Sequence, residues 1–310
     1  MNIAWKQTSA KELLTPYKAN KTYYKVFQTK ISNSKIPITV VQSPETREIM
    51  IAKQNNKGKI IPARLHLGME RTVNLCTATY TMASTDEFKK AINHQYIPEE
   101  ETISTMLMRE PITQSPFLNT FLGSGFQSRL YAVMDIHHVK DKKGLKGLGT
   151  KICSYRIDIP EKKTEEICED IKLGIFYDSI AGGRNLKAAF DELRRKFVNL
   201  EKAVFVSIYA TYEGCFRISE HCSRYGVSSE FFCIHELLKA NPQNEYDCFY
   251  PKWNICKKDE EILKNFYKKA FRKICLGGDF TANTLGIEQA RNVFLEQVEE
   301  LGLNPKDFEF

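Results

Sequence analysis

The chain has 310 residues, of which 42% are hydrophobic and 27% charged, and this composition excludes an intrinsically disordered protein. Its formal net charge is +7, but the 45 basic residues are interspersed with 38 acidic residues, so the charge favours anionic ligands only weakly. The sequence has no apolar run of about 18 residues and no N-terminal secretory signal pattern, so we expect a cytoplasmic protein without a membrane partner. The nine cysteines form no CxxC pair and are expected to be reduced core thiols.

The first part of the chain, residues 1–117, is expected to be a β-rich region or hood of unknown role. Apolar and β-branched stretches predict strands here, a polar run predicts a turn, and an N-cap-like Ser84-Thr85 start predicts a helix. The strands are expected over residues 22–27, 36–42 and 77–82, the turn over 54–59 and the helix over 85–92.

From residue 118 to 310 the pattern changes to alternating strands and helices, which predicts an α/β core with a mainly parallel sheet and helices on both faces. Strands are expected over residues 130–134, 151–155, 173–177, 203–210 and 229–234. Helices are expected over residues 186–197, 216–225, 259–273 and 287–301.

Basic residues are densest in three short stretches, residues 140–146, 194–196 and 257–273. Acids interrupt the last of them, as on a solvated helix face, so nucleic acid is not the expected partner. His221, His235 and the neighbouring cysteines match no zinc spacing, so no metal site made directly of side chains is expected.

A glycine-rich turn between a predicted strand and a predicted helix is the main candidate site. The strand LGIFY at 173–177 is followed by DSIAGGRN at 178–185 and then by good helix formers. Glycines let the backbone approach a ligand closely, and the free N–H groups of a helix start bind phosphate. We therefore predict a phosphate-binding loop; the alternative is a tight connection with Asp178 as an N-cap.

The order of four segments resembles the type I phosphoribosyltransferases, nearest to their uracil phosphoribosyltransferase branch. The first is the loop at 178–185, which resembles the phosphoribosyl diphosphate loop of that family. The others are a strand ending in Tyr-Arg (residues 149–156), an Ala-Thr-Tyr-Glu-Gly turn (210–214) and the stretch LGGDFTANTLG (276–286).

This resemblance implies transfer of a ribose 5-phosphate group from phosphoribosyl diphosphate to a nucleobase-like acceptor, with Mg²⁺, in a homo-oligomer such as a homodimer. Asp178 would hold the ribose hydroxyls and Arg156 would face the diphosphate. The 5′-phosphate site would comprise Ser179, Ala181, Gly182, Gly183, Arg184 and Asn185. The base site would comprise Tyr212, Glu213, Gly214, Gly278, Asp279 and Thr281.

Several positions depart from the family pattern. Tyr177 replaces the first of two acids, Gly182 and Asn185 replace hydroxyl residues, and Tyr212 replaces a proline. The segment matched to the diphosphate turn, residues 123–125, has no arginine. An alternative is therefore a non-catalytic nucleotide-binding sensor or regulatory protein of the same fold, and Glu213 is either an active-site carboxylate or an N-cap.

Overall fold

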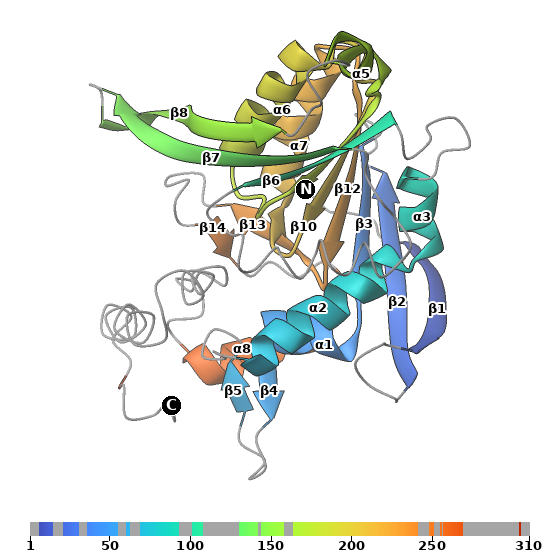
Figure 1. The fold of residues 1–310 in the computed structure, drawn as a ribbon. Helices are drawn as coiled ribbons and strands as arrows, with labels where there is room; N and C mark the ends of the chain where they lie inside the picture. The colour runs from blue at the N-terminus through green and yellow to red at the C-terminus, as the bar shows by residue number, and fades with distance from the viewer. Residues whose placement is uncertain are drawn as a thin grey trace.

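The computed structural model describes residues 6–14, 21–30, 36–54, 60–62, 69–92, 101–107, 130–141, 144–157, 164–240, 248–250, 255, 257–268 and 304. Its main element is a nine-stranded sheet with the order β1-β2-β3-β12-β10-β9-β6-β7-β8 (Figure 1). In that order the strands are Lys6–Leu14, Lys21–Lys30, Pro37–Gln42, Ser228–Ile234, Lys202–Ser207, Leu173–Tyr177, Thr102–Leu107, Leu130–Asp141 and Gly144–Ile157.

The central strands from β3 to β7 in the sheet order are all parallel to one another, whereas β1, β2 and β8 pair antiparallel at the two edges. Parallel neighbours need long crossover connections, and helices supply them here. The predicted α/β class with a mainly parallel sheet is confirmed, and the N-terminal strands β1 and β2 are found to pair antiparallel.

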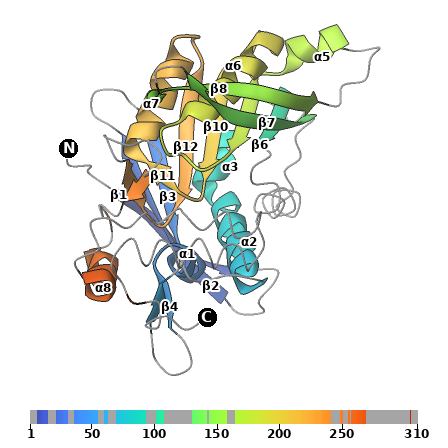
Figure 2. The same ribbon diagram turned by 90° about the vertical axis from the view of Figure 1, so that its left-hand side faces the viewer.

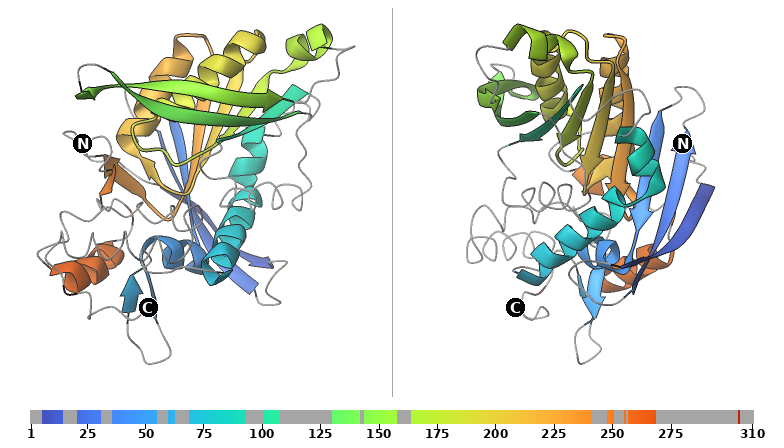
Figure 3. Two further views of the ribbon diagram at one scale, coloured as in Figure 1. Left: turned by 60° about the vertical axis from the view of Figure 1, so that its left-hand side comes forward. Right: turned by 45° about the vertical axis from the view of Figure 1, so that its right-hand side comes forward.

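Helices cover both faces of the sheet (Figures 2 and 3). On one face, α6 (Arg184–Lys196) and α7 (Tyr212–Ser223) share a core with β9, β10 and β12, and α5 (Thr164–Asp170) adds Ile167 to it. The other face has its own core, in which α1 (Pro44–Met50), α2 (Met69–Ala83) and α3 (Asp86–Ile92) pack. Burial on both faces explains why the central strands are nearly continuously apolar.

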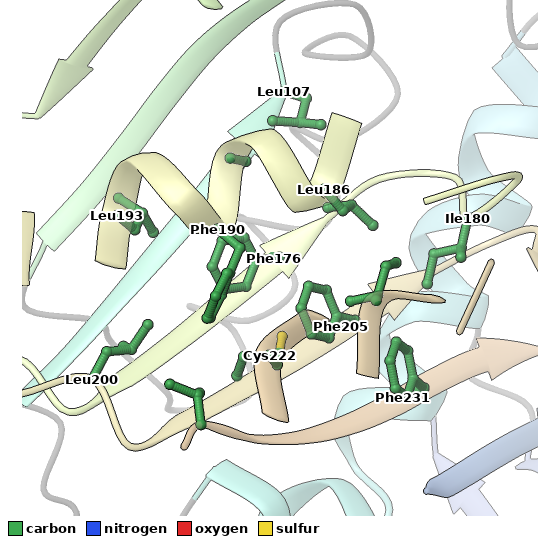
Figure 4. Close-up of a cluster of buried hydrophobic side chains, with 14 of the residues drawn as sticks. Leu107, Phe176, Ile180, Leu186, Phe190, Leu193, Leu200, Phe205, Cys222 and Phe231 are labelled. Atoms are coloured by element: carbon green, nitrogen blue, oxygen red, sulfur yellow. The ribbon is translucent and has the colours of Figure 1, made fainter. Parts of the chain in front are cut away.

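An aromatic row crosses the centre of the sheet on the α6–α7 face. Phe176, Phe205 and Phe231 are paired in register on β9, β10 and β12, and each neighbouring pair stacks with ring centroids 5.0 Å apart. Figure 4 shows these rings, with Phe190 of α6 next to Phe176 at a centroid distance of 6.3 Å. Because alternate residues of a strand face opposite sides, Ile175 and Tyr177 of β9 belong to the other core.

Smaller elements lie beyond the ends of the central strands. The strands β11 (Ala210–Thr211), β13 (Leu237–Ala240) and β14 (Cys248–Tyr250) form a three-stranded sheet, and β4 (Ala52–Gln54) pairs with β5 (Ile60–Pro62). The helix α8 (Lys257–Tyr267) follows β14 in the described chain. Residues 55–59 of the expected polar turn lie outside the described residues.

Strands from both predicted parts of the chain belong to the same sheet. Strands β1, β2, β3 and β6 precede residue 118, and β3 and β6 lie beside β12 and β9. The sheet therefore crosses the expected boundary between residues 117 and 118. The different roles assigned to the two parts remain a prediction.

The strand expected over residues 77–82 is wrong, because these residues lie in α2. Threonine favours strands, but here the Thr81 hydroxyl donates to the Thr77 carbonyl oxygen at 2.9 Å, one helical turn back. Ala78 and Met82, four residues apart, are both buried in the core. Tertiary packing therefore outweighs the local strand preference.

Other boundaries shift. The strand expected over 203–210 ends at Ser207 and resumes as β11, α7 begins four residues before the expected position at 216, and α8 ends at Tyr267. The helix expected over 287–301 lies outside the described residues. Within the described part of the chain, no helix combines the length and hydropathy that a membrane span needs.

Candidate functional site

The strand order changes direction between β6 and β9. From β6 the chain continues to β7 on one side, while from β9 it proceeds through β10 to β12 on the other. In doubly wound sheets, ligands bind outside the carboxyl ends of the strands at this point of reversal. Asp178 directly follows β9, so the predicted loop begins at the position where this topology favours a ligand.

The β9–α6 loop (residues 178–183) is held by the neighbouring strand and its own side chains. The amide of Asp178 donates to Val206 O at 3.3 Å and that of Ile180 to Tyr209 O at 2.7 Å. Asp178 Oδ1 accepts the amide of Ser179 at 2.8 Å. Asp178 is therefore not the N-cap of α6, and its carboxylate remains half-buried at the carboxyl end of β9.

Gly183 is the N-cap of α6 and adopts a left-handed backbone with φ of 77°. A side chain here would be strained, and its Cβ would lie 2.7 Å from Ile218 Cγ1 of α7. Without a side chain, Gly183 cannot accept a hydrogen bond from the first amides of α6. By contrast, α1 is capped by Ser43 and α7 by Thr211. Of these three helices at the carboxyl edge of the sheet, α6 is the one whose N-cap residue gives no side-chain hydrogen bond. A helix start of this kind favours binding of an anion.

The start of α7 packs directly against the β9–α6 loop. Thr211 Oγ1 donates to Ala181 O at 2.6 Å and accepts the amide of Gly214 at 3.0 Å. A Cβ at Gly214 would overlap Ala181 O and lie 2.7 Å from Ile180 Cγ2. The structure therefore brings the Tyr-Glu-Gly segment at 212–214 to the loop. Its role in base binding remains a prediction.

Asn185, in the first turn of α6, has a buried Oδ1 atom that accepts no hydrogen bond within the described structure. An unsatisfied buried acceptor is unfavourable by about 1–3 kcal/mol. Turning the amide over would present Nδ2, a donor suited to an anion at the helix start. Asn185 thus has unused hydrogen-bonding capacity beside the uncapped amides.

Tyr177 does not contribute a group to the loop. Its ring is buried in the core on the α2–α3 face, and its hydroxyl shares a hydrogen bond with Ser104 of β6. Burial, the largest effect, raises the pKa of Tyr177, which therefore stays neutral. The carboxyl end of β9 consequently carries a single acid, Asp178.

Arg156 lies on β8, in the same row across the sheet as the end of β9. It pairs with Val133 of β7, Val133 with Met106 of β6, and Met106 with Tyr177. Three strand spacings separate its backbone from β9 by about 14 Å. The structure therefore does not bring the Arg156 backbone close to Asp178. Gly278, Asp279 and Thr281 lie outside the described residues, as do residues 123–125.

Glu213 is not a helix N-cap, because Thr211 takes that position and Glu213 lies in the first turn of α7. Beside it, Tyr212 stacks on Phe216 with centroids 6.3 Å apart and is only partly buried. Burial and the neighbouring Glu213 raise the pKa of Tyr212. A half-exposed ring and a carboxylate therefore lie beside the β9–α6 loop.

Among the described residues, no group of three His, Cys, Asp or Glu side chains could hold a metal ion. Mg²⁺ commonly uses one or two carboxylates together with substrate phosphates. The lone carboxylate of Asp178 fits that arrangement and does not fit a structural ion held by protein alone. Asp178 is therefore the carboxylate of this loop that could contribute to such a site.

Three buried cysteines are not candidate nucleophiles. Cys215, Cys222 and Cys233 are free thiols buried in the core on the α6–α7 face. Burial raises the pKa of all three, so they remain protonated and unreactive near neutral pH.

Sequence reasoning missed Ser207 and Thr211, the two hydroxyl residues that fix the loop. Ser207 Oγ accepts the amide of Ile180 at 3.2 Å and donates to Tyr209 O at 2.6 Å. Thr211 had a recognisable signal, since threonine before a helical stretch favours an N-cap. Ser207 had none, because its partners come from the neighbouring connection.

The topology and the loop define a doubly wound α/β protein with an uncapped helix start at the point where strand order reverses. No family model and no curated protein sequence matches the chain. Among solved structures, the AQ2163 protein from Aquifex aeolicus is similar, with 18% identity over 55% of this chain and 77% of that one, and a TM-score of 0.38. A hypoxanthine-guanine phosphoribosyl transferase from L. donovani is similar with 10% identity over 54% of this chain and 82% of its own, and a TM-score of 0.32. At these TM-scores neither likeness defines the fold, and the class rests on the sheet topology.

Proposed function

We propose that the protein is a phosphoribosyltransferase-like enzyme that transfers a ribose 5-phosphate group from phosphoribosyl diphosphate to a nucleobase-like acceptor. The observation that carries the proposal is the uncapped start of α6 at the point of strand reversal, with Asp178 beside it. An anion site and an adjacent carboxylate together suit a sugar phosphate, because one binds the phosphate and the other the hydroxyls. The order of sequence motifs gives independent support.

Each group in the loop has a distinct proposed role. The first amides of α6, with the Asn185 amide group, would bind the 5′-phosphate, and Ser179 and Arg184 would border it. Gly183 keeps the helix start open and close to α7. Asp178 would hold the ribose hydroxyls, or the Mg²⁺ that accompanies the diphosphate. Tyr212 would offer a partly exposed ring for stacking with the base.

The proposed reaction needs no protein nucleophile. The bond between C1 of the ribose and the diphosphate oxygen breaks, its electron pair leaves with pyrophosphate, and a nitrogen of the acceptor forms the new bond to C1. The acceptor nitrogen loses its proton to solvent. Positive charge develops on the ribose in the transition state, and the carboxylate of Asp178 would stabilise it.

A specific observation favours a second function, a non-catalytic nucleotide sensor of the same fold. Tyr177 is buried with its hydroxyl on Ser104, so the end of β9 offers one acid instead of two. Such a site would retain a phosphate ligand but would hold the ribose less firmly. Binding without turnover would distinguish this function from the first.

The test is titration of the full chain with phosphoribosyl diphosphate and Mg²⁺, with affinity measured by calorimetry and turnover by pyrophosphate release. We expect saturable binding that Asp178→Asn weakens at least about 10-fold, the loss of one charge-assisted contact. Asn185→Ala should weaken it about 5-fold through a lost neutral hydrogen bond.

The matched control is Glu220→Gln, which removes an exposed carboxylate from α7. It should leave binding unchanged. Wild-type protein that binds neither phosphoribosyl diphosphate nor a nucleoside monophosphate would refute both functions, whereas normal binding by Asp178→Asn would show that the site lies elsewhere.

A further inference from the structure

Tyr209, in the turn after β10, connects the β9–α6 loop with α1. Its main-chain carbonyl oxygen accepts the amide of Ile180 at 2.7 Å and the hydroxyl of Ser207 at 2.6 Å. Its own hydroxyl donates to the carbonyl oxygen of Ile49 in α1 at 3.0 Å. This buried residue therefore contacts the loop through its main chain and a separate helix through its side chain.

Ile180, in the middle of the loop, pairs with the turn after β10. Its amide donates to Tyr209 O, and its carbonyl oxygen accepts the amide of Thr211 at 2.8 Å, as in a parallel sheet. Asp178 lies two residues before Ile180, and Gly183 lies three residues after it. A shift of this pairing would therefore move both the carboxylate and the start of α6.

The helix α1 is a fixed point of attachment for the Tyr209 hydroxyl. Ile49 lies in its last turn, where a helix leaves carbonyl oxygens without amide donors of its own. A capping box closes the other end of α1, and Arg47 Nε donates to Asp259 Oδ1 of α8 at 2.9 Å. Because α1 is held at several points, the hydrogen bond to Ile49 restricts the Tyr209 ring.

The Tyr209 side chain is rigid enough to relate the position of the loop to that of α1. Its ring is buried in the core on the α1–α3 face, in the same cluster as Ile49 and Met50. A tyrosine side chain has few rotatable bonds, and close packing in a core leaves its ring little room to move. The hydroxyl and the carbonyl oxygen of Tyr209 are therefore held at a nearly constant separation.

We propose that Tyr209 is a positioning residue, through which α1 sets the backbone of the β9–α6 loop for its ligand. The inference rests on the proposed function for the identity of that ligand, whereas the effect on the loop concerns the free protein. The bond to Ile49 holds the ring, and the Tyr209 carbonyl oxygen in turn holds the Ile180 amide. Loss of the hydroxyl should therefore loosen the loop, although the hydroxyl lies in the core opposite α6.

A purely structural explanation of the hydroxyl is the alternative. A buried tyrosine hydroxyl normally has a hydrogen-bond partner, and this one satisfies a carbonyl oxygen that α1 leaves without a donor. Under that explanation, Tyr209→Phe lowers the stability of the whole fold and affects all slowly exchanging amides alike. A selective change at Ile180 separates the two explanations.

The experiment measures amide hydrogen exchange by NMR in the free protein, for the wild type and for Tyr209→Phe. The Phe205 amide, in the central strand β10, reports global opening. We expect the ratio of the Ile180 rate to the Phe205 rate to rise at least about 10-fold, as when one hydrogen bond is lost. The matched control is Thr81→Val, which also removes a buried hydroxyl that donates to a carbonyl oxygen, here within α2. It should leave the ratio unchanged.

A second variant, Arg47→Gln, removes the ion pair between α1 and Asp259 and leaves Tyr209 intact. It should raise the same ratio about 3-fold, because α1 then holds the Tyr209 hydroxyl less firmly. Lys90→Gln, an exposed change on α3, should not raise it. No rise for Arg47→Gln would overturn the proposal even if Tyr209→Phe does not fold.

The ligand is tested separately, by calorimetry with phosphoribosyl diphosphate and Mg²⁺. Tyr209→Phe should bind this ligand about 5-fold more weakly than the wild type. A raised exchange ratio with wild-type affinity would overturn the proposal, as would an unchanged ratio whatever the affinity. Wild-type protein that does not bind the ligand would refute the proposed function, and a selective change at Ile180 would still support the role of Tyr209 in the loop.

Discussion

The carboxyl edge of the sheet differs between the part at β9 and the part at β3 and β12 in how the adjoining helix starts are held. At the β9 end, backbone hydrogen bonds and glycine packing hold the loop, and the start of α6 has no side-chain cap. At the β3–β12 end, Ser43 and Thr46 form a capping box that closes the start of α1. Beside it, His235 Nε2 lies 2.8 Å from Asp259 Oδ2 and Arg47 Nε donates to Asp259 Oδ1 at 2.9 Å.

The difference indicates which end is available to a ligand. At the β3–β12 end the charged and polar groups satisfy one another, with His235 and Asp259 each 3% exposed. His235 even adopts a left-handed backbone with φ of 62°, a strained conformation that its contacts with Thr46 and Asp259 help to maintain. The ion pairs at that end attach α8 to the sheet, whereas at the β9 end no side chain caps the start of α6.

The largest expected effect on stability is at the β3–β12 end. Asp259→Ala should lower the free energy of unfolding by about 4 kcal/mol, because it leaves His235 and Arg47 without their buried partner. Urea denaturation measures this. Glu261→Gln, an exposed change in the same helix, serves as the control. A loss for Asp259→Ala no greater than the control would mean that this end does not depend on its ion pairs.

At the β9 end, backbone packing should dominate. Gly214→Ala should cost about 3 kcal/mol of unfolding free energy, because the added Cβ would overlap the Ala181 carbonyl oxygen. Gly226→Ala is the comparison, since nothing lies near its Cβ and only its φ of 72° costs about 1 kcal/mol. Similar losses in the two variants, measured by urea denaturation, would show that close packing does not fix the loop.

Thr211 joins the loop to α7 and should have a moderate effect. Thr211→Val keeps the shape but removes the hydrogen bonds to Ala181 and Gly214, at a cost of about 1 kcal/mol. Thr211→Ser should retain most of the stability, because it keeps the hydroxyl. Thermal denaturation of the two variants side by side would detect the difference, and equal melting temperatures would contradict the role.

The smallest expected effect on stability is at Asp178. Asp178→Asn should change the unfolding free energy by less than about 0.5 kcal/mol, since the amide oxygen can still accept from Ser179. The same variant should lose ligand affinity. A large destabilisation in urea would instead assign Asp178 to the structure of the loop, and the contrast between the two ends would disappear.

The site was predictable where its signal is local. The buried strand at 173–177, the glycines after it and the helix from 184 are adjacent in sequence, so their pattern alone located the loop. The prediction for residues 77–82 was wrong, because threonines that favour strands lie here in a helix. The Thr81 hydroxyl donates its hydrogen bond to the Thr77 carbonyl oxygen of the same helix. Ser207 was not predictable, because its hydrogen bond to Ile180 joins residues 27 positions apart.

The sequence by itself determined the α/β class and the position of the loop, because hydrophobic period, glycine and helix propensity act over a few neighbouring residues. The tertiary structure decided which side chains lie near the β9–α6 loop. Strand order placed the β9–α6 loop at the reversal point, buried Tyr177 on the opposite face and separated the Arg156 backbone from Asp178 by two intervening strands. These outcomes depend on long-range strand pairing, which local sequence preferences do not specify.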